Sequence, residues 1–201
     1  MLQGVERMLV RALAGWLGCC MATGCVLGRV EPTPLRGAVP RTIAVLPVAP
    51  ARVGIGLDEA LQARGHRIVA SAVTAQLLAT AGVVVAGSRP PDLGQAAGAD
   101  ALLYVEVNAF EATGVRPLRE AHWDLRWRLV AAATGAEIWS WESAGSWRHR
   151  DTDPGNTQPS PDGLLQPVPI GGPSVPSFRD DSDLLSWLHR TAFDRLPRAT
   201  R

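Results

Sequence analysis

The residue with the clearest chemical signature in this chain of 201 residues is Cys25. The basic residues Arg7 and Arg11 precede a short apolar stretch, Ala12 to Met21, and the small residues Ala22 to Gly24 come directly before the cysteine. A basic head, a short apolar segment and small residues at the cut are typical of a secretory signal peptide. A cysteine directly after the cut offers the thiol to which bacterial lipoproteins attach diacylglycerol. The pattern therefore predicts a lipobox, with lipid on Cys25.

The predicted cleavage lies between Gly24 and Cys25. Ala22 stands where a lipobox usually has leucine, so two alternatives stay open: a buried N-terminal helix, and a signal peptide that is cut elsewhere. A single acyl chain holds a protein on a membrane only marginally, whereas two or more hold it stably. A triacylated Cys25 would anchor the whole protein. Val26 in place of an aspartate favours sorting to the outer membrane, on its periplasmic face.

Two other groups of residues match catalytic or binding motifs in part. His149 to Asp151, with Asn156 five residues later, have the spacing of a protein-kinase catalytic loop, but the chain has no lysine to contact nucleotide phosphates. Gly54 to Gly56 follow the first expected strand as in a dinucleotide-binding loop, but Glu59 stands where the third glycine belongs. Neither motif has the context that its chemistry requires.

The acidic residues and the histidines do not form a convincing site either. Asp151, Asp153 and Asp162 fall at ligand positions of a calcium-binding loop, but Gly155 and Asn156 disrupt the pattern between them. The four histidines are scattered along the chain, without the paired spacing of a zinc site. We therefore expect no catalytic residue, no cofactor and no metal, and a protein that is not an enzyme.

Tryptophan is concentrated in one part of the chain. Four of the seven tryptophans, Trp123, Trp127, Trp139 and Trp141, lie within a short stretch. They have two interpretations: one face of a hairpin that packs in the core, or a surface that binds a partner, since tryptophan is enriched at interface hot spots.

Composition excludes several classes of partner and site. The chain has 20 arginines and no lysine, against 19 acidic residues, and removal of residues 1–24 leaves a mature chain with no net charge. Nucleic-acid binding needs clustered positive charge, so this balance argues against it. Two of the three cysteines leave with the signal peptide, so the mature chain can form no disulfide. After Gly24 no apolar run reaches the ~20 residues of a membrane span.

The first half of the domain alternates strands and helices. Strands are expected at 42–46, 67–70 and 101–110, and helices at 57–64, 71–81 and 92–97. Val73, Leu77 and Leu78 are expected on the buried face of the second helix. Strand–helix–strand order predicts parallel neighbouring strands joined by right-handed crossovers.

The second half has a different pattern. From His122 apolar and polar residues alternate, which indicates a strand with one buried and one solvent-exposed face. A turn at Thr134-Gly135 and a partner strand from Glu137 to Trp147 complete a hairpin. Ser182 is expected to cap a final helix. The fold class is therefore α/β: a small mixed sheet of strand–helix units, followed by an antiparallel tryptophan-rich hairpin and a C-terminal helix.

These elements divide the chain into five parts. Residues 1–24 are the predicted lipoprotein signal peptide, and 25–41 are the lipidated cysteine and a Pro-rich tether. Residues 42–147 form the α/β domain and 148–180 a Pro/Gly-rich loop. Residues 181–197 form a C-terminal helix that packs on the domain.

Several of these residues also carry a resemblance to a known family. They are Thr42 to Val48 at the first strand, Arg64-Gly65-His66, Gly98 to Val105, and Thr134-Gly135 followed by Ile138-Trp139. The chain resembles bacterial lipoproteins of unknown function that accompany CsgG-type curli-secretion proteins, and whose domain is similar to the amino-terminal domain of TolB and to the periplasmic domain of CsgG. The resemblance covers Thr42 to Gly145 and Leu184 to Pro197. It implies an outer-membrane lipoprotein that works by assembly, and only Cys25 carries over as a site.

The expected function is a lipid-anchored, non-enzymatic periplasmic domain that binds envelope proteins, including a CsgG-type protein, within a secretion or envelope-maintenance assembly. Two alternatives stay open. One is a regulator that docks on a cell-wall synthase. The other is a protein or enzyme that binds a small ligand at the carboxyl ends of the parallel strands, near Pro47 to Gly56 and Ala86 to Pro91.

Overall fold

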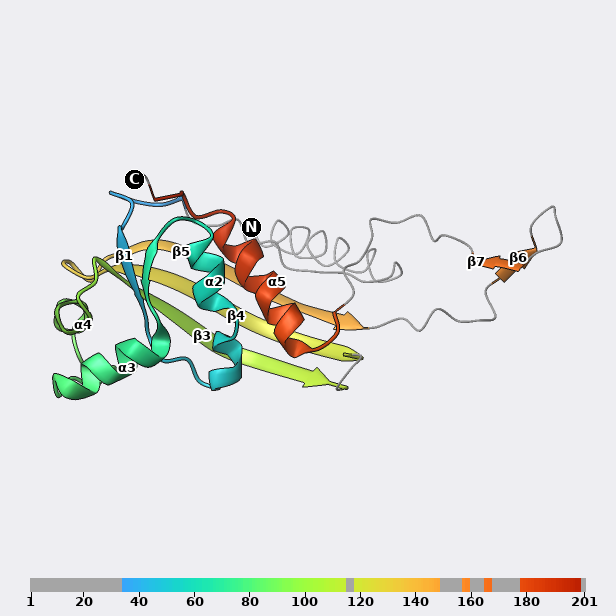
Figure 1. Ribbon diagram of the computed structural model, residues 1–201, viewed down its shortest axis with the longest axis horizontal. Coiled ribbons are helices and arrows are strands. Elements are labelled where there is room, and N and C mark those ends of the chain that lie inside the picture. The colour runs from blue at the N-terminus through green and yellow to red at the C-terminus, as the bar shows by residue number, and fades with distance from the viewer. Residues whose placement is uncertain (1–33, 115–117, 149–156, 160–164, 168–177, 200–201) are drawn as a thin grey trace, which may run out of the picture.

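A five-stranded mixed sheet in the order β2-β1-β3-β4-β5 forms the centre of the molecule (Figure 1). The computed structural model describes residues 34–114, 118–148, 157–159, 165–167 and 178–199. The α/β class, the antiparallel hairpin and the C-terminal helix predicted from the sequence are confirmed.

The elements follow one another in the predicted order, with one additional 3-10 helix, η1. The strands of the sheet are β1 (Thr42–Val45), β2 (Arg67–Val69), β3 (Ala101–Thr113), β4 (Glu120–Ala131) and β5 (Glu137–Arg148). The helices are η1 (Ala51–Gly54), α2 (Leu57–Gln62), α3 (Ser71–Thr80), α4 (Pro90–Ala97) and α5 (Asp181–Phe193). Within the region predicted to be a loop, β6 (Thr157–Pro159) and β7 (Leu165–Pro167) form a short antiparallel pair.

The sheet has a parallel half and an antiparallel half. β1 pairs in parallel with β2 and with the start of β3, whereas β3, β4 and β5 are antiparallel to one another. β1 is an almost continuous apolar run because helices cover both of its faces. The antiparallel strands are much longer, and a bulge between Val107 and Ala109 shifts the register of β3 against β4. One end of the sheet, which we call the tether end, therefore contains the starts of β1, β2, β3 and β5 and the end of β4.

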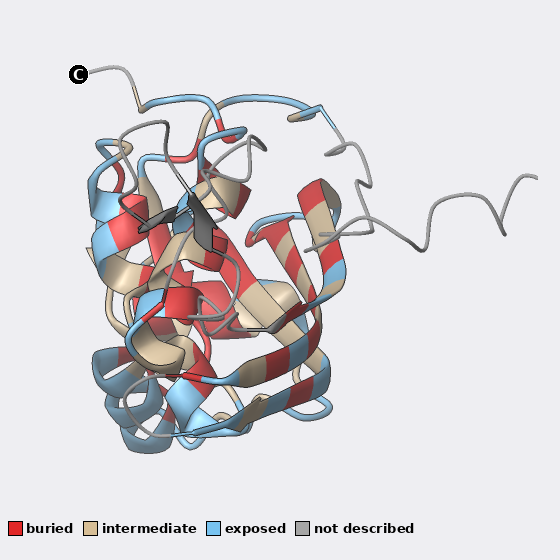
Figure 2. Ribbon diagram, turned by 90° about the vertical axis from the view of Figure 1, so that its right-hand side faces the viewer, coloured by how far each residue is buried: buried red, intermediate tan, exposed pale blue. Residues whose placement is uncertain are grey.

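Two apolar clusters hold helices on opposite faces of the sheet. On one face α2 and α5 pack against Ile43 and Val45 of β1 and against alternate residues of β3, β4 and β5. On the other face α3 and α4 pack against Ala44 and Leu46, which point the opposite way from their neighbours on the strand. Bands of buried and partly buried residues alternate along the long strands in Figure 2.

Three of the four tryptophans of the hairpin belong to the core, which corrects for them the interpretation that they form a partner surface. Trp123, Trp127 and Trp139 are buried in the cluster that α5 covers, and Trp141 is partly buried with its ring centroid 5.0 Å from that of Trp127. Burial within the chain keeps the three core rings from meeting another protein, whereas part of Trp141 stays exposed.

Two details of the helices also differ from the prediction. In α3 the buried residues are Thr74 and Leu78, whereas Val73 and Leu77 are exposed. This helix is apolar on most of its surface, so hydrophobic spacing alone could not identify which side faces the sheet. In α5 the cap is Asp180, whose side chain accepts a hydrogen bond from the N–H of Asp183.

Close contact between helices and neighbouring segments depends on two glycines. A Cβ atom at Gly94 of α4 would lie 2.3 Å from the Cβ of Ala132, directly after β4. A Cβ atom at Gly56, which has a φ of +77°, would lie 2.5 Å from Oγ of Ser186 on α5. A larger residue at Gly94 would force α4 away from Ala132, and one at Gly56 would be strained by the positive φ.

His189 is the one ionisable group in the centre of the larger cluster among the described residues. Its Nδ1 accepts a hydrogen bond from Nε1 of Trp127 at 3.2 Å, and its Nε2 donates to the carbonyl oxygen of Val53 at 2.8 Å. These partners fix one neutral tautomer. Burial lowers the pKa of His189 to about 4, although the hydrogen bond to Val53 and the charge of Glu59 oppose the shift.

We expect acid to destabilise the fold through His189. Because the folded-state pKa lies near 4 and the ordinary value is 6.5, the unfolded chain binds the extra proton between these pH values. The stabilisation is complete above pH 6.5 and is lost as the pH falls toward 4, by about 3 kcal/mol. Urea unfolding across this range should give a steeper pH dependence for the wild type than for His189→Gln.

The matched control is Gln62→Ala, which changes an exposed residue of α2 that has no ionisable side chain. This variant should keep the wild-type slope. Equal slopes for the wild type and His189→Gln would contradict the buried neutral imidazole.

Candidate functional site: the charged face of the long strands

The antiparallel half of the sheet has one face that no described helix covers. α3 and α4 pack on β1 and on the start of β3, as far as Tyr104. Beyond this point the strands present polar side chains on the side away from α5. We call this surface the charged face. Its residues are Glu106, Asn108, Glu111, Glu120, His122, Asp124, Arg126, Arg128, Glu137 and Glu142.

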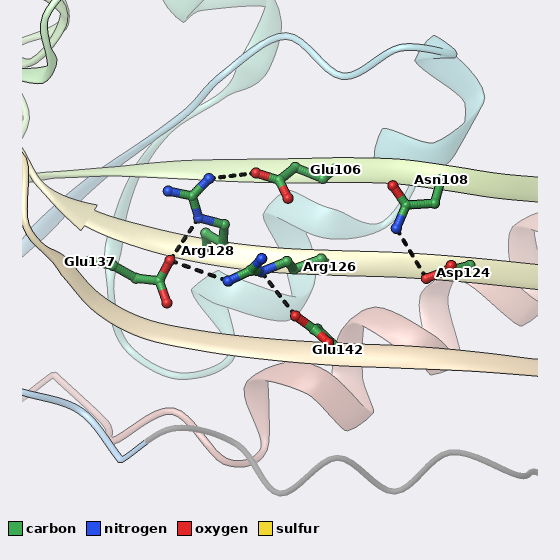
Figure 3. A network of polar contacts seen from close by, with 7 residues as sticks. All are labelled: Glu106, Asn108, Asp124, Arg126, Arg128, Glu137 and Glu142. Carbon is green, nitrogen blue, oxygen red and sulfur yellow. Dashed lines mark hydrogen bonds and ion pairs between the residues drawn. The ribbon is translucent and has the colours of Figure 1, made fainter.

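Two arginines of β4 connect the three strands (Figure 3). Arg128 lies between Glu106 of β3 and Glu137 of β5, and its Nε is 2.7 Å from Oε2 of Glu137. Arg126 lies 3.1 Å from Oε1 of Glu142 and 3.6 Å from Oε2 of Glu137. Such cross-strand pairs of opposite charge stabilise a sheet modestly, and they hold each side chain in place.

A second contact continues this pattern toward the far end of the strands. The side-chain amide of Asn108 donates to Oδ1 of Asp124 at 3.3 Å. Further along, Nε2 of His122 lies 3.1 Å from Oε1 of Glu120. The polar side chains therefore form a continuous surface along β4 and its two neighbours.

The arginine partners of Glu137 keep its carboxyl group charged. Burial raises the pKa of Glu137, but hydrogen bonds from Ser140 and Arg128 and the charges of both arginines outweigh this effect and hold the pKa below its usual value. The side chains of Arg128 and Glu137 are each 32% exposed, so solvent and other molecules can reach them. The charged side chains are therefore held in place by ion pairs and are still accessible to other molecules.

Acidic groups predominate on the charged face. The carboxylates are those of Glu106, Glu111, Glu120, Asp124, Glu137 and Glu142, and the guanidinium groups are those of Arg126 and Arg128. Among the described side chains of this face the carboxylates therefore outnumber the guanidinium groups, although the predicted mature chain has no net charge overall. This separation of charge suits a surface that selects a partner by electrostatic complementarity.

The geometry supports binding better than acid–base chemistry. A general acid or base needs a pKa near the working pH, whereas Glu137 is held ionised by its arginine partners. In the described part of the chain no group of three or more histidine, cysteine or acidic residues could hold a metal ion. Nothing in these contacts requires a cofactor.

The structure brings few of the residues singled out in the sequence together. Gly24, Cys25, the 149–156 motif and Asp162 lie outside the described residues. Gly54 to Gly56 lead into α2, and of these three residues Gly56 lies against Ser186 of α5. A Cβ atom at Gly54 would meet nothing within 4 Å, and Ile55 is exposed. The loop near the carboxyl end of β1, one candidate ligand site, is therefore packed against α5 in part.

Sequence reasoning recognised the polar face of β4 but not the charged network. The alternation from His122 onward showed that Arg126 and Arg128 point away from the core. Their partners on β3 and β5 depend on strand register, and the bulge in β3 changes that register. The signal that could have found the contacts to β5 is the Thr134-Gly135 turn, since turn length fixes hairpin register.

Comparison with known proteins gives a limited set of similarities. No family model matches the chain, and no curated protein matches it. Among solved structures it is similar to the lipoprotein GNA1162 from Neisseria meningitidis, at 22% identity and a TM-score of 0.45, over 58% of this chain and 89% of that one.

Two further structures resemble this chain at lower identity. The PelC dodecamer from Paraburkholderia phytofirmans is 14% identical with a TM-score of 0.49, over 89% of this chain and 100% of that one. The hypothetical protein CT253 from Chlamydia trachomatis is 14% identical with a TM-score of 0.32, over 52% of this chain and 69% of that one. Similarity at this level assigns neither a family nor a function.

Replacement of Arg128 by glutamine should raise the pKa of Glu137, because it removes a hydrogen-bond donor and a neighbouring positive charge. The side-chain carboxyl resonance of Glu137, followed by NMR as the pH is lowered, measures this shift. Arg119→Gln, which changes an exposed arginine outside the network, should leave the titration unchanged. An unaltered Glu137 titration in Arg128→Gln would show that the ion pair does not form in solution.

Proposed function

We propose that this chain is a lipid-anchored, non-enzymatic protein of the bacterial envelope that uses the charged face to bind other envelope proteins. The observation that carries the proposal is the uncovered half of the sheet, where ion pairs hold an acidic surface in a fixed arrangement. The lipid anchor comes from the sequence pattern that ends at Cys25.

The anchor accounts for location. The basic head, the apolar segment and the small residues before Cys25 support export and lipid attachment, and Val26 supports the periplasmic face of the outer membrane. Within the described residues, no helix has the length and apolar character needed to cross a membrane. In this proposal the lipid on Cys25 is what holds the protein at the membrane.

The charged face accounts for partner binding. An acidic surface attracts a partner with an excess of basic side chains, and complementary charge raises the association rate and disfavours other partners. The cross-strand ion pairs already restrict the side chains in the free protein. Binding therefore costs less side-chain conformational entropy. The resemblance to lipoproteins that accompany CsgG-type proteins makes a secretion or envelope-maintenance assembly the first place to look for this partner.

We expect palmitate labelling of growing cells to mark the wild-type protein and not Cys25→Ala. The substituted residue lacks the thiol that takes the diacylglycerol, so neither lipid attachment nor lipoprotein-type cleavage can follow. Gel fluorography together with the mass of the purified chain checks both steps. Cys20→Ala is the control and should be labelled like the wild type. Equal labelling of Cys25→Ala would remove the basis for the membrane location.

Binding through the charged face should depend on its carboxylates. We expect the double variant Glu111→Gln, Glu142→Gln to lose most of the protein that crosslinks to the wild type in cells, at least about fivefold, because each removed charge weakens attraction to a basic partner. Affinity capture from detergent-solubilised membranes, followed by quantitative mass spectrometry, measures this recovery.

The matched control is Glu59→Gln, Asp92→Asn, which changes the net charge equally on residues outside the charged face. It should recover the same partner as the wild type. Full recovery by the charged-face variant would show that binding uses another surface.

A further inference from the structure

Three segments that are far apart in the sequence meet at the tether end of the sheet. Nδ1 of His66 lies 3.0 Å from the carbonyl oxygen of Pro40, and Nε2 lies 3.2 Å from that of Pro197. This buried imidazole therefore joins the segment before β1, the start of β2 and the C-terminal tail. In Figure 1 the blue segment before β1 and the dark red C-terminal tail lie side by side there.

Backbone hydrogen bonds tighten the same junction. The N–H of Arg67 donates to the carbonyl oxygen of Arg41 at 2.9 Å, and the N–H of Ala199 donates to that of Arg64 at 3.2 Å. Nε of Arg64 also donates to the carbonyl oxygen of Leu196 at 3.1 Å. The positions of the arginines on these segments are thus set by the fold.

These segments carry a group of positive charges, which we call the basic end: Arg41, Arg64, Arg67, Arg195 and Arg198. Arg64 is largely covered and pairs with Asp194 at 3.8 Å. The other four are exposed, and no residue in the described part of the chain forms an ion pair with their side chains.

A second acidic group at this junction is Asp100. Its carboxylate accepts hydrogen bonds from the backbone N–H groups of Arg41 and Thr42, at 3.2 and 3.0 Å. The Asp100 carboxylate therefore binds the backbone at the start of β1 and does not pair with the arginine side chains of the basic end. The basic end has a net positive charge, in contrast to the negative charged face.

The basic end is also where the chain enters the domain. The N–H of Arg36 donates to the carbonyl oxygen of Ile138 at the start of β5, at 2.8 Å, and the chain then passes Pro40 to reach β1. Pro34 is the first described residue, and the stretch from Cys25 to Pro34 can span at most about 30 Å. A lipid on Cys25 would hold this end of the domain, with its exposed arginines, close to the membrane.

We propose that the basic end binds a surface of anionic phospholipid. Guanidinium groups pair well with lipid phosphates, and each basic side chain near an anionic membrane contributes on the order of a fivefold gain in binding. The contact orients the domain on its tether and keeps the acidic charged face free for a protein partner. The inference rests on the proposed function, because the lipid anchor is what keeps the tether end near the bilayer.

The test uses the chain from residue 25 onward with Cys25→Ser, which contains every described residue and cannot carry the lipid. Co-sedimentation with phosphatidylglycerol vesicles at low salt should exceed that with phosphatidylcholine vesicles, and added salt should reduce it. The triple variant Arg67→Gln, Arg195→Gln, Arg198→Gln should bind at least about tenfold more weakly. Thermal unfolding checks that the triple variant is folded.

The matched control is Arg89→Gln, Arg119→Gln, Arg179→Gln, which removes the same charge from exposed arginines outside the basic end and should bind like the unsubstituted chain. Equal losses in both triple variants would overturn the proposal, as would equal binding to the two lipids. Because the chain carries no lipid, these outcomes are independent of palmitate labelling and partner capture, so failure of this inference and failure of the proposed function are distinguishable.

Discussion

The packing of α5 across the tryptophan-bearing face of the sheet is the interaction on which the rest of the structure depends. The helix lies over β3, β4 and β5, and it is joined to both the hairpin and η1 through His189. Burial of a large ring such as that of Trp127 removes much apolar surface from water. Its Nε1 donates a hydrogen bond to Nδ1 of His189, so both nitrogens have a partner in the interior. Without this helix the long antiparallel strands would expose their largest side chains.

The charged face is the consequence of the same strand pattern on the opposite side. Since side chains alternate along a strand, burial of Trp127 on one side places Arg126 and Arg128 on the other. The short helices α3 and α4 cover β1, the start of β3 and the residue after β4, so these arginines meet carboxylates of the neighbouring strands instead of a helix. The molecule thus has one apolar face that is satisfied internally and one polar face that is available to other molecules.

Charge is distributed unevenly over a domain that is almost neutral as a whole. The carboxylates lie on the uncovered sheet face, while arginines gather where the chain enters and leaves the domain. In the function and the lipid contact that we propose, these two surfaces of opposite sign would bind two different neighbours, a basic protein at the charged face and an anionic membrane at the basic end. Neither surface is visible in the net charge, which sums over both.

The sequence by itself determined the α/β class and the element order, because hydrophobic periodicity and turn residues are local properties. It also predicts the signal at Cys25 from a targeting pattern, which is local as well. It also identified which residues of β4 point to solvent. Only the tertiary structure decided that Trp123, Trp127 and Trp139 are core, that Thr74 and not Val73 faces the sheet, and that Arg128 lies between Glu106 and Glu137. These facts depend on strand register and on which helix covers which face, and distant segments fix both only when they pack together.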